Sequence, residues 1–183
     1  MNKIFLDNSI KLFKYYKSLG DKALSQLQPQ QIFSQLNEQT NSIAIIIKHL
    51  SGNMLSRWTN FLIEDGEKEW RDRDNEFVVN EMNLEKLLIQ WEKGWACLFN
   101  TLEEIIPNDL TKLIFIRNEG HTVTEAIIRQ TAHYAYHVGQ LVLLAKYFSN
   151  DKWESLSIPK NKSQEFNNTK FSNEKYVKNF TDQ

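Results

Sequence analysis

The chain has 183 residues, of which 41% are hydrophobic and 25% are charged, as in an ordinary globular protein. Its 22 lysine and arginine residues balance 23 aspartate and glutamate residues without a basic block, which argues against a nucleic-acid partner. The longest apolar run, residues 43–47, is far shorter than the ~20 residues that span a bilayer, so we expect no membrane insertion. Asp7 and Lys11 interrupt the apolar run that a signal peptide needs, and the single Cys97 cannot form an internal disulfide. We therefore expect a cytoplasmic protein.

Apolar residues recur at helical spacing in four segments, and local signals mark several of their ends. Pro29 interrupts the first segment, and Thr40 or Asn41 can cap the second. Pro107 stops the third, and the fourth begins at Thr122 with the spacing of a capping box that includes Glu125. The predicted helices span residues 5–27, 42–63, 84–105 and 122–148.

The segments between these helices have other patterns. Residues 64–80 carry charges of mixed sign without periodicity, so we predict a surface loop in which residues 71–74 are solvated. Residues 113–116 are short and β-branched and precede a turn at 118–120, which predicts a short strand or hairpin arm. Overall we predict an all-α four-helix bundle in residues 1–150 and an irregular tail, residues 151–183, packed on it.

Three histidines form the strongest candidate site. His133 and His137 lie four residues apart in the last predicted helix, which places both rings on one face, a turn apart. His49 lies in the second helix, on a face of small and polar residues. If these helices are neighbours, the three imidazoles can form a site with open coordination positions. Incidental histidines explain the spacing about equally well, so the spacing alone leaves metal binding open.

The residues around the histidines exclude two familiar kinds of metal site. Tyr134 stands where a zinc peptidase of the His-Glu-x-x-His type has its general base. No histidine has a glutamate three residues before it, as the di-iron bundles require. A mononuclear site remains.

Other reactive or aromatic residues have simpler interpretations. We interpret Cys97 as a buried structural thiol rather than a nucleophile, and His121 as a turn residue rather than a ligand. Four of the five tryptophans are expected in the core or as loop anchors rather than around a ligand cavity. They are Trp58, Trp70, Trp91 and Trp95.

Residues 41–53, residues 56–61 with 65–67, and residues 133–140 resemble the DinB/YfiT-like superfamily of four-helix bundles. More closely, the chain is similar to a bacterial subfamily of unknown function within it. The similarity covers about residues 4–170. This resemblance implies a metal triad that falls on His49, His133 and His137.

Better-understood members of that superfamily use low-molecular-weight thiols such as bacillithiol or mycothiol. The resemblance therefore suggests such a thiol as a cosubstrate to test, while no sequence feature identifies it. The imidazole ligands suit a zinc, nickel or iron(II) ion as cofactor. Asn53 and Gln140 are placed to orient a ligand or to support the metal ligands. No residue can be assigned as the catalytic base.

Two classes of function stay open. The first is a metal-dependent enzyme, either a thiol S-transferase or a small hydrolase, acting on a small-molecule ligand. The second is a non-catalytic stress-associated or ligand-binding bundle on the same scaffold. A homodimer is compatible with either class, and a purely structural protein with incidental histidines is a third interpretation.

Overall fold

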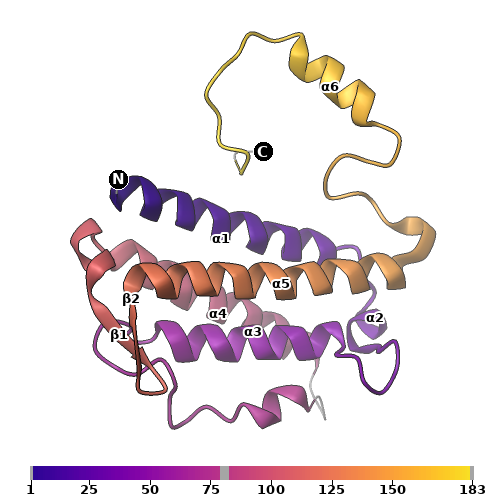
Figure 1. Ribbon diagram of the computed structural model, residues 1–183. Coiled ribbons are helices and arrows are strands. Elements are labelled where there is room, and N and C mark those ends of the chain that lie inside the picture. Colours follow the sequence, from indigo (N-terminus) through magenta and orange to yellow (C-terminus); the bar gives the residue numbers. More distant parts are fainter. Residues whose placement is uncertain (1, 79–82, 182–183) are drawn as a thin grey trace.

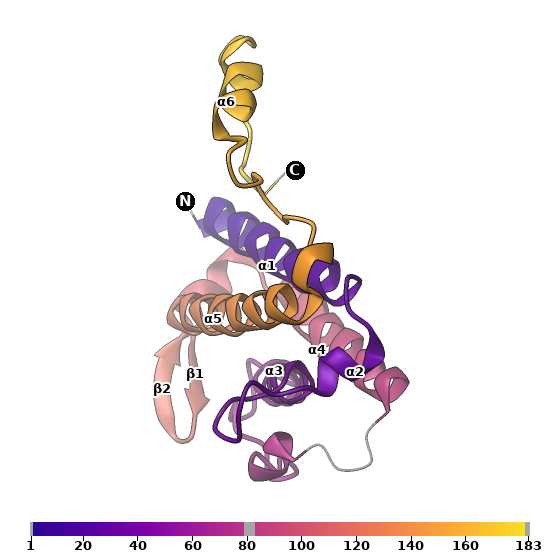
Figure 2. The same cartoon turned by 90° about the vertical axis from the view of Figure 1, so that its right-hand side faces the viewer.

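Long helices dominate the computed structural model, which describes residues 2–78 and 83–181 (Figure 1). Four of them pack around a shared core, with α3 against α4 and α5, and α1 against α5 and α4 (Figure 2). A two-stranded antiparallel hairpin lies beside the start of α5. The α-helices of the described residues are α1 (Asn2–Leu24), α2 (Pro29–Phe33), α3 (Ile43–Trp58), α4 (Leu84–Glu104), α5 (Val123–Ser149) and α6 (Ser163–Phe171). The strands are β1 (Leu113–Ile116) and β2 (Glu119–Thr122).

Side chains cap the starts of the helices that carry the candidate site. Ser42 Oγ accepts a hydrogen bond from the Ile45 amide at the start of α3. At α5, the predicted capping box is present: Thr122 Oγ1 accepts from the Glu125 amide, and the Glu125 carboxylate accepts from the Thr122 amide. The cap of α3 is therefore Ser42, so the prediction of Thr40 or Asn41 is wrong by one or two residues, whereas α5 begins at the predicted capping box.

The hairpin prediction is confirmed, and a distant carboxylate supports its turn. Arg117 and Asn118 connect the strands with φ values of 57° and 62°, as a two-residue hairpin loop with two left-handed residues requires. The Asp65 carboxylate accepts hydrogen bonds from both of their amides, each at 2.8 Å. The hairpin is thereby anchored to the segment that follows α3.

Three predicted segments differ from the structure. The second predicted helix ends at Trp58 rather than residue 63, because Asn60 adopts φ 50° and the chain turns there. A short helix, α2, occupies part of the stretch that was expected to be only an interruption. The tail is not wholly irregular, since it contains α6 and a single 3-10 turn at Asn150–Lys152.

The tail contacts the long helices near its two ends. Its first part bonds to the residues just after α1, where the backbone of Glu154 makes two hydrogen bonds with the Gln26 side chain. Near its end, the Phe180 ring lies 5.4 Å from the Tyr15 ring of α1. Between these points α6 is exposed along its whole length and lies beyond α1 in both views (Figures 1 and 2). The division of the chain at residue 150 stays a prediction.

None of the helices in residues 2–78 and 83–181 is both long enough and apolar enough to cross a membrane.

Candidate metal centre

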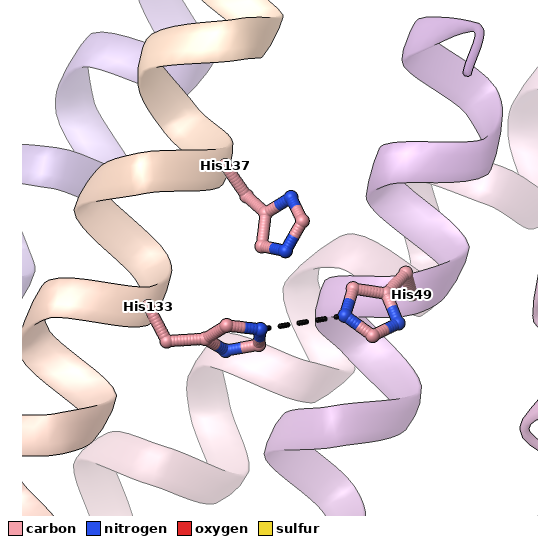
Figure 3. Close-up of side chains that lie close together, drawn as sticks. All are labelled: His49, His133 and His137. Atoms are coloured by element: carbon pink, nitrogen blue, oxygen red, sulfur yellow. Dashed lines mark hydrogen bonds between the residues drawn. The ribbon is translucent and has the colours of Figure 1, made fainter. Parts of the chain in front are cut away.

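The structure brings the three predicted histidines together. His49 projects from α3, and His133 and His137 project from adjacent turns of α5 toward it (Figure 3). Each residue offers one nitrogen, and these three nitrogens all lie within 4.8 Å of one another. Within the described part of the chain, no other three histidine, cysteine, aspartate or glutamate side chains bring their ligand atoms together in this way.

Hydrogen bonds orient two of the rings. His49 Nδ1 lies 2.9 Å from Glu76 Oε2, and His137 Nδ1 lies 2.9 Å from Gln140 Oε1. Because both partners are oxygen acceptors, each Nδ1 carries the proton and donates it. The Nε2 lone pairs of His49 and His137 are thus left for another partner.

The third ring completes the arrangement. His133 Nε2 lies 3.4 Å from His49 Nε2. The dashed line in Figure 3 marks this hydrogen bond. His133 Nδ1 is buried and has no hydrogen-bond partner. Two nitrogens that bind one tetrahedral ion at about 2.0–2.1 Å lie about 3.3–3.4 Å apart, so the observed separation suits a shared ion.

Burial keeps two of these imidazoles in the form that binds metal. Burial, together with the smaller electrostatic effects of His137 and His49, lowers the pKa of His133 from 6.5 to about 3. The pKa of His137 is lowered by burial and by His49, with the Gln140 hydrogen bond opposing them. Neutral imidazole is the metal-ligating form, so both rings are ready to bind at neutral pH.

The loop after α3 contributes a buried carboxylate that sequence reasoning missed. Glu76 is 6% exposed, and besides His49 it binds Arg71, whose Nε lies 2.8 Å from Oε1. Burial raises the Glu76 pKa, but the hydrogen bonds from His49 and Arg71 outweigh it and lower the pKa overall. The prediction that residues 71–74 are solvated is wrong for Arg71, because its side chain is 2% exposed.

The two expected supporting residues lie in different surroundings. Gln140 contacts His137, as described above. Asn53 is buried and its Oδ1 accepts a hydrogen bond from the Tyr134 hydroxyl at 3.1 Å, within the core beside α5. A ligand-orienting role for either residue stays a prediction.

The remaining candidates lie outside the cluster. His121 is half-buried in β2, and Cys97 is half-buried on α4 with its Sγ 3.6 Å from Thr59 Oγ1. Three tryptophans are core residues, as predicted, and Trp70 is 59% exposed in the loop after α3. The three are Trp58, Trp91 and Trp95.

The chain is similar to a known protein family over most of its length. Residues 1–162 match a family described as a protein of unknown function, DUF1572. No curated protein and no solved structure matches the chain.

Proposed function

The chain belongs to the DUF1572 family of unknown function, and we propose that it binds one divalent metal ion through Nε2 of His49, His133 and His137. The observation that carries this proposal is the 3.4 Å separation of the His49 and His133 Nε2 atoms. Without a shared cation or proton, two lone pairs at this distance repel each other. Zinc, nickel and iron(II) all accept imidazole, so the donor set suits a first-row transition metal.

The number of protein ligands supports an open rather than a closed metal site. A structural zinc site is closed by four protein ligands, whereas this cluster offers three. A bound ion of this kind lowers the pKa of a coordinated thiol or water, so that it is a nucleophile at neutral pH. The chain's own part is to hold three imidazoles, two of them fixed by hydrogen bonds to Glu76 and Gln140, on two packed helices.

We further propose that the chain is a DinB/YfiT-like four-helix bundle and a metal-dependent enzyme. Its reaction would be thiol S-transfer to a small electrophile or hydrolysis of a small substrate. The proposal is supported by the helix order, the site at the junction of α3 and α5, and the resemblance of the histidine segments.

Metal binding is tested first, on untagged protein, because a polyhistidine tag binds the same metals. Elemental analysis and titration with zinc, nickel and iron(II) should give one ion per chain, and His133→Ala should lose it. Turnover is then tested with the metal-loaded protein, bacillithiol and monochlorobimane, again with His133→Ala as the control. One ion per chain without turnover would favour the non-catalytic ligand-binding alternative. Absence of binding by the wild-type protein would refute the proposed function.

A further inference from the structure

We propose that Glu76 is a positioning residue of this metal centre, an inference that rests on the proposed function. Its carboxylate holds the His49 ring in the tautomer and orientation in which Nε2 is the ligand atom. Glu76 lies in the 3-10 turn Asp74–Phe77, in the loop that follows α3. It is 27 residues after His49 in the sequence. The inference therefore assigns a role at the site to a segment outside the ligand-bearing helices.

The contacts of the carboxylate distinguish it from an incidental neighbour. Oε2 lies 2.9 Å from His49 Nδ1 and 3.1 Å from Arg71 Nη2, and Oε1 lies 2.8 Å from Arg71 Nε. All three residues have side chains that are at most 8% exposed. Arg71 thus donates hydrogen bonds to both carboxylate oxygens of Glu76 and holds Oε2 in the orientation that contacts the His49 ring.

Arg71 is itself tied to the rest of the loop. Its Nη1 lies 3.6 Å from Glu67 Oε2. The same Glu67 oxygen pairs with Arg57 of α3 and with Arg117 in the hairpin turn. This chain of ion pairs joins the carboxylate beside His49 to α3 and to the hairpin, which limits its freedom to turn away.

A glycine on α3 makes room for the carboxylate. A Cβ at Gly52 would lie 2.2 Å from Glu76 Oε1 and 2.9 Å from its Cδ. Any larger residue there would force the carboxylate to move. Since Gly52 is one turn from His49 on the same helix, the Glu76 carboxylate packs against α3 directly beside the His49 ring.

The Glu76 carboxylate in this position acts on the ring of His49. A carboxylate that accepts the Nδ1 proton selects the Nδ1–H tautomer, restrains ring rotation and makes Nε2 a better donor to a cation. Loss of such a partner typically weakens metal affinity by about 10- to 100-fold.

Two variants remove the contact in different ways. Glu76→Gln keeps the size of the side chain but offers one acceptor oxygen to donors on both His49 and Arg71. Gly52→Ala keeps every polar group and displaces the carboxylate by steric contact. The controls are Glu69→Gln, an exposed glutamate of the same loop, and Gly139→Ala, a helical glycine whose Cβ would meet nothing within 4 Å.

Two measurements are made on each protein. Affinity for cobalt(II) and zinc is measured by competition with a chromophoric chelator, together with the cobalt absorption spectrum. The tautomer of His49 in the metal-free protein is measured by long-range ¹H–¹⁵N correlation. Both site variants should bind metal about 10- to 100-fold more weakly and show a mixed His49 tautomer, whereas both controls should match the wild type.

The outcomes separate the two proposals. If wild-type protein binds no metal, the proposed function fails, and the tautomer measurement still tests the positioning of His49. If both site variants keep wild-type affinity, or keep the pure Nδ1–H tautomer, Glu76 is only a loop anchor and this inference is overturned. A merely structural role would lower thermal stability without moving the tautomer.

Discussion

The hydroxyl of Tyr134 joins α3 and α5 inside the core, and its removal should destabilise the protein measurably. The residue is fully buried. Its hydroxyl accepts a hydrogen bond from Trp58 Nε1 at 2.9 Å and donates one to Asn53 Oδ1 at 3.1 Å. Burial raises its pKa, so the phenol stays protonated at all ordinary pH values.

Tyr134→Phe removes only the hydroxyl, so the ring contacts with Phe13 and Trp95 remain. The indole N–H and the amide oxygen lose this partner while buried, and each unsatisfied group costs about 1–3 kcal/mol. We expect the free energy of unfolding to fall by roughly 2–4 kcal/mol, since the two losses are not fully additive. This corresponds to a melting temperature lower by roughly 4–16 °C.

Urea denaturation followed by circular dichroism measures this change, and the slope of the transition should be unaltered. The matched control is Tyr136→Phe, two residues along the same helix, whose side chain is 63% exposed. Its free energy of unfolding should change by no more than about 0.5 kcal/mol. Equal stability of Tyr134→Phe and the wild type would show that the buried hydroxyl contributes nothing net, contrary to this reasoning.

Three further outcomes are expected. His137→Ala should lose the metal but keep its far-ultraviolet circular dichroism at 25 °C, since the apolar core is built without the site; a largely unfolded spectrum would contradict this. His121→Ala should bind metal with unchanged stoichiometry in elemental analysis, because that ring lies in β2 outside the cluster, and a lost ion would show otherwise. The pKa of His133 is lowered from 6.5 to about 3 in the folded protein. As the pH falls below 6.5, the His133 ring is therefore protonated in the unfolded chain but stays neutral in the folded protein, which favours unfolding. The metal-free protein should therefore lose stability in urea between pH 7.5 and 5.5, and His133→Gln should lose part of this dependence; identical pH profiles would refute the assignment.

The sequence by itself determines the elements whose cause is local. The Thr122 and Glu125 box marks the start of α5, and the apolar stripe before Pro107 predicts α4. Because side chains four residues apart on a helix share a face, the pairing of His133 with His137 also follows from the sequence alone. His49 could be added to that pair once α3 and α5 were assumed to be neighbours, and the structure confirms that the three rings meet.

Contacts between segments distant in the sequence were decided only by the tertiary structure. Glu76 reaches His49 because the loop after α3 folds back over Gly52, and no periodicity in a mixed-charge segment signals which carboxylate is buried. Asn53 shares the small, polar face of α3, yet its amide oxygen binds Tyr134. Helical spacing fixes the direction of a side chain relative to its own helix, whereas its partner depends on which neighbouring segment packs against that face.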